Sequence, residues 1–159
     1  MKLENRVAIV TAAGRGIGRA IAMCLAKEGA DVVISSFHEE TTASTAKEIE
    51  ALGRQALTMP GDITTTGVIS QVVQETLDTF GRIDILVNNV GARPMIPKEA
   101  GDGPLGLIGV NWDSAYEQNL RAPVLMSEAV APHFIEKLNG KIINISSIAG
   151  RVALPEKLQ

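Results

Sequence analysis

The sequence predicts an α/β protein: a doubly wound parallel sheet in three layers, with helices on both faces. Short apolar runs alternate with segments whose apolar residues recur at helical spacing along the whole chain. The apolar runs are continuous, as expected for parallel strands that helices cover on both sides. A glycine-rich turn joins the first apolar run to the first helical segment. The 159 residues are expected to form one domain, since domains commonly hold about 100 to 200 residues.

Five apolar runs predict the strands, and the first of them, Val7–Thr11, should be central in the sheet. The other four are predicted at Asp31–Ser35, Gln55–Met59, Ile83–Asn88 and Lys141–Ser146. Strands that alternate with helices form right-handed crossovers and bind ligands at the carboxyl ends of the strands. The sheet is expected to end after the fifth strand, where this sequence stops.

Helical spacing predicts four helices, at Ile17–Glu28, Glu39–Leu52, Ile69–Phe80 and Trp112–Leu138. Glycine follows each of the first three and can end the helix there. The first helix should bury an apolar stripe that includes Cys24, which we expect in the core. The segment Ala92–Val110 has no periodicity and is rich in Gly and Pro, so it is predicted to be an irregular loop over the ligand pocket.

Composition excludes several classes of partner. The net charge is −3 and no dense basic run occurs, so we expect no nucleic-acid partner. The longest apolar stretches span only a few residues, and charges alternate at Lys2, Glu4 and Arg6, so we expect no membrane span and no signal peptide. A single cysteine allows no disulfide framework, and we assign no metal site. A cytoplasmic protein fits these features best.

The turn at Thr11–Gly18 reads Thr-Ala-Ala-Gly-Arg-Gly-Ile-Gly and predicts a phosphate-binding cradle. Glycine accepts positive φ and lets a pyrophosphate approach the backbone, while the free N–H groups of the next helix attract negative charge. The backbone of four residues should face the pyrophosphate, and Gly18 should let helix and strand pack closely. Those four are Ala12, Gly14, Gly16 and Ile17.

Polar residues also follow three other predicted strands. Asp62 follows the third strand, Asn88 and Asn89 end the fourth, and Ser146 and Ser147 end the fifth. Because the strands are predicted to be parallel, these side chains should gather with the glycine turn at one edge of the sheet.

In order and spacing these motifs resemble those of the short-chain dehydrogenase/reductase family. The motifs are Thr11–Gly18, Asp62-Ile63, Asn88–Gly91, Asn119 and Ile145–Gly150, and the similarity covers the entire chain. The resemblance implies a Rossmann-type domain with a nicotinamide dinucleotide across the strand ends. It further implies hydride transfer between that cofactor and a small carbonyl or alcohol substrate.

The resemblance implies roles for five residues around the adenosine half of the cofactor. Asp62 would hydrogen-bond the adenine amine and Ile63 would flank the ring. Asn89 and Gly91 would support the central strand and line the adenine ribose, and Val90 stands where alanine is usual in the family.

Two further residues would serve catalysis by the same resemblance. Ser147 would donate a hydrogen bond to the substrate oxygen, and Asn119 would hold a water in a proton relay. The family's tyrosine acid/base lies about thirteen residues past this serine, which is position 160, and its lysine lies four residues further on. No other side chain is placed to protonate a ketone in their stead, so we expect the 159-residue chain to be inactive by itself.

Cofactor preference depends on the end of the second strand, where Ser36 stands in place of the acidic residue usual in NAD enzymes. Arg15 in the glycine turn can give charge-assisted hydrogen bonds to a 2′-phosphate. NADP(H) is therefore favoured, with NAD(H) left open. A second departure from the family is Ala12 at the position of its first glycine, where Gly14 should add flexibility two residues later.

Three functional hypotheses remain open. The first is the NAD(P)(H)-dependent oxidoreductase described above. The second is a non-catalytic dinucleotide-binding or regulatory module. The third is another Rossmann-like enzyme such as a methyltransferase, which would not be expected to carry the asparagine and serine motifs. The family resemblance also implies a homo-oligomer that forms through the Trp112–Leu138 helix.

Overall fold

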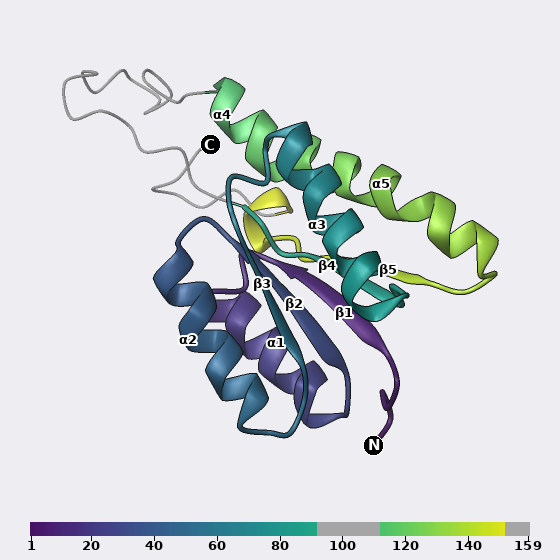
Figure 1. Ribbon diagram of the computed structural model, residues 1–159. Coiled ribbons are helices and arrows are strands. Elements are labelled where there is room, and N and C mark those ends of the chain that lie inside the picture. The colour runs from purple at the N-terminus through teal and green to yellow at the C-terminus, as the bar shows by residue number, and fades with distance from the viewer. Residues whose placement is uncertain (92–111, 152–159) are drawn as a thin grey trace.

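The computed structural model describes residues 1–91 and 112–151, drawn as a ribbon in Figure 1. The strands in this part of the chain are β1 (Val7–Thr11), β2 (Asp31–Ser36), β3 (Ala56–Pro60), β4 (Ile85–Asn88) and β5 (Lys141–Asn144). The helices are α1 (Gly16–Lys27), α2 (Glu39–Glu50), α3 (Thr66–Phe80), α4 (Trp112–Tyr116) and α5 (Ala122–Glu136). A π-helical turn, η1 (Glu117–Arg121), joins α4 to α5, and a 3-10 turn, η2 (Ile148–Gly150), follows β5.

The strands form one parallel sheet in the order β3-β2-β1-β4-β5, so β1 is central as predicted. Val10 illustrates the register, because it pairs with Ile34 of β2 on one side and with Val87 of β4 on the other. Every residue of β1 is buried. Since all strands run the same way, their carboxyl ends share one edge of the sheet, as the sequence predicted.

The sheet separates two apolar clusters and so makes three layers (Figure 1). On one face Ala8 and Val10 pack with Ala22 and Ala26 of α1. On the other face are Ile9, Val33 and Leu86, with Ile69 and Val72 of α3 and Met126 and Val130 of α5. Alternate residues of β1 thus enter opposite layers, as the period of two in a strand requires. None of the described helices is long and apolar enough to cross a membrane.

The face that α1 buries differs from the one predicted. Its buried residues are Gly18, Ala22 and Ala26, whereas Cys24 is exposed and Ile17 is 66% exposed. Cys24 lies two residues, about 200° of helical rotation, from both Ala22 and Ala26, and therefore faces solvent. The prediction of a core Cys24 was wrong because the small residues, rather than the larger apolar ones, let this helix approach the sheet.

The helix predicted over Trp112–Leu138 is interrupted at η1 and ends at Glu136. Pro123 has no N–H, so the α-helical hydrogen bond to the Asn119 carbonyl cannot form. Proline is a usual cause of such irregular turns. The interruption therefore falls on a predicted site residue. The predicted loop Ala92–Val110 lies outside the described residues.

Strand β5 lies at the edge of the described sheet and begins at Lys141 as predicted, but it ends at Asn144 rather than Ser146. All its residues are exposed, with Ile142 at 41% and Ile143 at 44%. The part of the chain that the structure describes thus leaves this edge strand largely uncovered. The fourth strand likewise is shorter than predicted and starts at Ile85 rather than Ile83.

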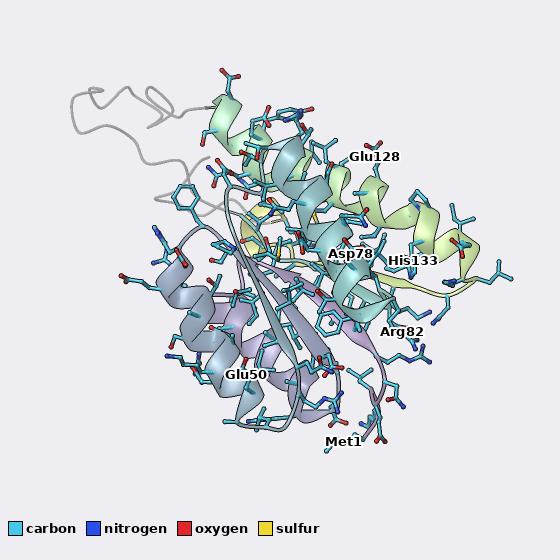
Figure 2. The ribbon with its side chains drawn as sticks, viewed as in Figure 1. Met1, Glu50, Asp78, Arg82, Glu128 and His133 are labelled. Carbon is cyan, nitrogen blue, oxygen red and sulfur yellow. The ribbon has the colours of Figure 1, made fainter. Side chains whose placement is uncertain are left out.

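At the opposite edge of the sheet, the buried Asp84 ties β1 to β4. Its carboxylate accepts hydrogen bonds from Arg6 Nη1 at 2.8 Å, from the Val7 N–H at 2.9 Å and from Arg82 Nε and Nη2 at 2.8 and 2.6 Å. Burial by itself raises the pKa of Asp84, but the bonds from Arg82, Val7 and Arg6 outweigh it and lower the pKa below its ordinary value. Nearby, His133 Nε2 accepts the Ile83 N–H at 3.1 Å, and Figure 2 shows His133 and Arg82 at the same end of the molecule.

Replacing Asp84 by asparagine should lower the free energy of unfolding at pH 7 by about 2 to 3 kcal/mol, because two arginines would lose a buried carboxylate. The lowered pKa means that the carboxylate stabilises the fold fully above the unfolded-state pKa of about 4, and that this stability is lost as the pH falls through the folded-state pKa. Urea unfolding between pH 3 and pH 7 should therefore show a weaker acid dependence in Asp84→Asn than in the parent.

Asp78→Asn is the matched control, because Asp78 is exposed and accepts one bond within its own helix, from Gln74 at 2.8 Å. Its unfolding free energy should stay within about 0.5 kcal/mol of the parent. Equal effects from the two substitutions would show that Asp84 does not anchor this edge.

Candidate functional site at the carboxyl edge of the sheet

The carboxyl ends of β1 and β4 are joined by a set of hydrogen bonds between Thr11 and Asn89. Thr11 Oγ1 accepts the N–H groups of Asn89 at 2.9 Å and Val90 at 3.0 Å, and it donates to the Val87 carbonyl at 3.4 Å. Asn89 Nδ2 donates in return to the Thr11 carbonyl at 3.1 Å. The family resemblance gave Asn89 the role of supporting the central strand, and these contacts provide that support.

The glycine-rich turn leaves β1 through two residues with left-handed backbone. Ala12 has φ +51° and Gly16 has φ +56°. Glycine adopts this conformation without strain, whereas alanine pays about 1 to 2 kcal/mol because of its Cβ. The methyl group at Ala12 is therefore accommodated at a cost in backbone strain.

Gly14 and Gly18 are required for space rather than for positive φ. A Cβ on Gly14 would collide with Thr41 Oγ1 and lie 3.0 Å from Ser36 Oγ, and a Cβ on Gly18 would collide with the Ala12 carbonyl. Gly14 is not among the positive-φ residues. The expectation that Gly14 supplies flexibility in place of Ala12 was therefore wrong, because Gly14 makes room for α2 instead.

The backbone at Gly16 and at the start of α1 is exposed. A Cβ added at Gly16 would meet nothing within 4 Å, so the backbone is open to a ligand there. Helix α1 begins at Gly16, spans 12 residues and has no acidic residue in its first turn. Its N–H groups and dipole thus present positive charge without a competing carboxylate. Ile17 follows with its side chain exposed.

Ser36 and Arg15 lie on either side of Gly14. The contact between Gly14 and Ser36 Oγ brings the end of β2 against the turn, and Arg15 is the exposed next residue. The first acidic residue beyond Ser36 is Glu39, at the start of α2. The Thr41 and Ser36 hydroxyls are thus the side-chain groups nearest Gly14.

Asp62 and Ile63 follow β3, and the structure gives them different surroundings. Asp62 is exposed, and its Oδ1 accepts bonds from the Thr64 N–H at 2.9 Å and from Thr64 Oγ1 at 2.8 Å. This turn fixes the carboxylate and leaves Oδ2 available to a donor. The Ile63 side chain is only 6% exposed and packs in the cluster with α3.

Asn119 lies in the π-helical turn η1, close to Gly91. A Cβ on Gly91 would lie 2.9 Å from Asn119 Oδ1, which shows how near the two residues are, and Asn119 Nδ2 donates to the Ala115 carbonyl at 2.9 Å. Arg121 Nη1 reaches across to the Thr64 carbonyl at 3.4 Å and ties η1 to the loop that holds Asp62. The structure thus brings the asparagine of the helix to the end of β4.

Ser147 is exposed between β5 and η2, at the same edge of the sheet. Its position follows from the bond of the Ile145 N–H to the Asn88 carbonyl at 2.9 Å, which continues the pairing of β4 with β5. Of the other side chains that could transfer a proton, His38 is exposed just after β2, Tyr116 is exposed at the end of α4, and His133 lies at the Asp84 edge. The bond that His133 accepts from the Ile83 N–H agrees with a packing role.

Sequence reasoning missed a polar network beneath the catalytic candidates. The buried Asn88 donates from Nδ2 to Asn144 Oδ1 at 2.9 Å, to Ser127 Oγ at 3.2 Å and to the Pro123 carbonyl at 3.3 Å. Asn88 and Asn144 are register partners. The sequence contains a signal for this network, because Asn88 and Asn144 are each a polar residue at the end of an apolar strand.

The carboxyl edge of the sheet thus combines the open backbone at the start of α1, the Asp62 carboxylate, the Ser147 hydroxyl and the Asn119 amide. Such a set can hold a dinucleotide along the strand ends and orient an oxygen of a second molecule near Ser147. Among the described residues no cluster of three or more His, Cys, Asp or Glu could hold a metal ion.

A family model described as short chain dehydrogenase matches residues 6–158, and the chain belongs to the short-chain dehydrogenase/reductase family. Among curated relatives, a hydroxy(phenyl)methylsuccinyl-CoA dehydrogenase subunit of Thauera aromatica is 36% identical, and a 3-oxoacyl-acyl-carrier-protein reductase of Thermotoga maritima is 33% identical. Each alignment covers 94% of this chain but only 58% of the relative. The chain therefore spans less than two thirds of their length.

Solved structures of the family share the fold. A 7α-hydroxysteroid dehydrogenase complexed with NADH and 7-oxo glycochenodeoxycholic acid matches with a TM-score of 0.83 and 33% identity, over 96% of this chain and 57% of its own. A metagenomic short-chain oxidoreductase in complex with NADP matches with a TM-score of 0.83 and 36% identity, over 97% of this chain and 67% of its own. The Rossmann-like parallel sheet is thereby established.

Ala12→Gly should raise the free energy of unfolding by about 1 kcal/mol, because it removes the Cβ from a residue with φ +51°. Urea denaturation of the two proteins measures the difference. Ala20→Gly is the control, since Ala20 is an exposed residue inside α1, where glycine should cost about 0.5 to 1 kcal/mol. A destabilised Ala12→Gly would show that Ala12 is not strained.

Proposed function

We propose that this chain binds a nicotinamide dinucleotide and belongs to an NAD(P)(H)-dependent oxidoreductase that acts on a small carbonyl or alcohol. The observation that carries the proposal is the open cradle at Gly16 and the start of α1, fixed in place by the Thr11–Asn89 bonds. The two structurally similar oxidoreductases complexed with NADH and with NADP support it.

Around the adenosine and the pyrophosphate, three regions of the chain have distinct tasks. The cradle residues Ala12, Gly14, Gly16 and Ile17 would present backbone to the pyrophosphate. Asp62 has an oxygen left to accept the adenine amine, since Thr64 occupies only Oδ1. The backbone of Ile63 rather than its buried side chain is then the part available beside the ring. Asn89, Val90 and Gly91 form the wall at the end of β4.

In the catalytic half, Ser147 would donate a hydrogen bond to the substrate oxygen and Asn119 would hold a water of the proton relay. The bound dinucleotide supplies or accepts the hydride. The family's tyrosine and lysine occupy positions past residue 159, so we propose that these 159 residues alone bind the dinucleotide without turnover. The activity, substrate and partners of a longer protein remain part of this proposal.

We further propose that the site prefers NADP(H) to NAD(H). Ser36 Oγ lies against the glycine turn, Arg15 follows Gly14, and no carboxylate precedes Glu39 to repel a 2′-phosphate. NAD(H) still fits the site, because the cradle and Asp62 do not contact the part of the molecule that distinguishes the two cofactors.

Calorimetric titration of the purified chain with NADPH and NADH tests these proposals together. Arg15→Ala should weaken NADPH by about tenfold and NADH by less than twofold, because it removes a charge-assisted bond to the 2′-phosphate. Lys27→Ala, which removes an exposed cation from the far end of α1, is the control and should change neither affinity.

Equal losses for both cofactors in Arg15→Ala would refute the NADP(H) preference. Binding of S-adenosylmethionine without either dinucleotide would refute the oxidoreductase proposal. With a panel of ketones, the same chain should not consume NADPH, and steady consumption would show that the expected tyrosine is dispensable.

A homo-oligomer is also proposed, through the helical segment Trp112–Leu138. Tyr116, Leu120 and Val124 are exposed by 53%, 56% and 47%, and they recur every four residues. Such spacing places apolar side chains on one face of a helical segment, and an exposed apolar stripe of this kind marks a protein interface.

The double variant Leu120→Glu, Val124→Glu should shift the chain toward monomer, because charge on both copies of the stripe opposes its burial. Sedimentation velocity at several concentrations measures the shift. Leu52→Glu, at an exposed site just after α2, should leave association unchanged. Identical sedimentation of the parent and the double variant would exclude this face as the interface.

A further inference from the structure

Helix α2 touches the glycine-rich turn through threonine hydroxyls. Thr45 is fully buried, and its single Oγ1 hydrogen is shared between the Gly14 carbonyl at 3.3 Å and the Thr41 carbonyl at 3.1 Å. Thr41 Oγ1 fills the space that a Cβ on Gly14 would need. Gly14 therefore meets α2 at two points, its carbonyl oxygen and its Cα.

The bond at the Gly14 carbonyl sets the direction of the next N–H group. The peptide between Gly14 and Arg15 is trans and planar, so its C=O and N–H point in opposite directions. Because the C=O is turned toward Thr45 of α2, the Arg15 N–H is turned away from α2. A side chain that contacts no ligand thus orients a donor of the turn.

Three elements hold successive residues of the turn. Asn89, after β4, holds Thr11; the Ser35 carbonyl of β2 accepts the Ala13 N–H at 3.1 Å; and Thr45 of α2 holds Gly14. Beyond Gly14 the chain enters α1, whose own hydrogen bonds fix it. Thr45 is therefore the last external support before the helix begins.

We propose that Thr45 is a positioning residue of the dinucleotide site, which orients the Gly14–Arg15 peptide so that the Arg15 N–H faces the phosphates. This inference rests on the proposed dinucleotide binding and adds a residue of α2 to the site. It assigns to Thr45 no contact with the cofactor itself.

Thr42 provides a matched control from the same helix. It is buried as completely as Thr45, but its hydroxyl bonds only to carbonyls of its own first turn, those of His38 at 3.3 Å and Glu39 at 2.6 Å. Substitution of either threonine by valine keeps the shape of the side chain and removes one buried hydroxyl. Of the Thr42 and Thr45 hydroxyls, only that of Thr45 bonds to the glycine-rich turn.

The experiment measures NADPH and NADH affinity by calorimetry for Thr45→Val, Thr45→Ser and Thr42→Val. Thr45→Val should weaken both cofactors by about fivefold, the effect of one ordinary hydrogen bond, while Thr45→Ser and Thr42→Val stay within twofold of the parent. Thr45→Ala repeats the test with a smaller side chain, in case valine prevents folding.

A second readout needs no ligand. In the ligand-free chain, the amide resonance of Arg15 should shift in Thr45→Val and return toward its parental position in Thr45→Ser, with no shift in Thr42→Val. Equal loss of affinity in the two valine variants, or an unmoved Arg15 amide in Thr45→Val, would overturn the assignment.

The two readouts also separate this inference from the proposed function. If the parent chain binds neither NADPH nor NADH, the proposed function fails and the positioning role in that site fails with it, whatever the Arg15 amide shows. If the parent binds and Thr45→Val binds equally well, only the positioning role is lost.

Discussion

The hydrogen bonds between Thr11 and Asn89 are the constraint on which the site depends. Thr11 Oγ1 takes the N–H groups of both Asn89 and Val90, and Asn89 Nδ2 returns a bond to the Thr11 carbonyl. The chain therefore leaves β1 in a direction fixed by the end of β4. Helix α1 must then cross the Ala12 carbonyl so closely that residue 18 has no room for a Cβ. The turn, α1 and the end of β4 are therefore in mutual contact.

The central pair of strands is held by polar contacts at both ends and by apolar packing between them. At the amino end Asp84 binds Arg6, Arg82 and the Val7 N–H, and at the carboxyl end Thr11 and Asn89 join the same two strands. The buried charge satisfies its hydrogen bonds within the protein, so its burial does not leave an unpaired ion. At the carboxyl end, neutral groups make the contacts between the two strands. The local electrostatic field there comes from the start of α1. An anion at the cradle thus meets no buried carboxylate of this core.

Sequence pattern predicted the features that depend on periodicity. The central β1, the alternation of strands with helices and the shared carboxyl edge all follow from apolar runs and their spacing. Contacts between distant elements carry no such signal. From the sequence alone, Gly14 was expected to supply flexibility and Cys24 to lie in the core. The structure shows that Thr41 lies against Gly14, and that Ala22 and Ala26 define the buried face of α1. The roles of Thr45 and of the Asn88 network likewise depend on packing that one sequence does not reveal.

The glycine-rich turn therefore combines two separate requirements. Positions 12 and 16 need a left-handed backbone, and positions 14 and 18 need the absence of a Cβ because α2 and the Ala12 carbonyl lie against them. The left-handed backbone is not restricted to glycine, because alanine can adopt it at a cost of about 1 to 2 kcal/mol. The second is steric: at Gly18 a Cβ would meet backbone, and at Gly14 it would meet the side chains of Thr41 and Ser36, which would have to move. This difference agrees with the departure from the family pattern at Ala12, where alanine can adopt the required backbone, and with the glycine kept at Gly18, where a Cβ would meet the Ala12 carbonyl.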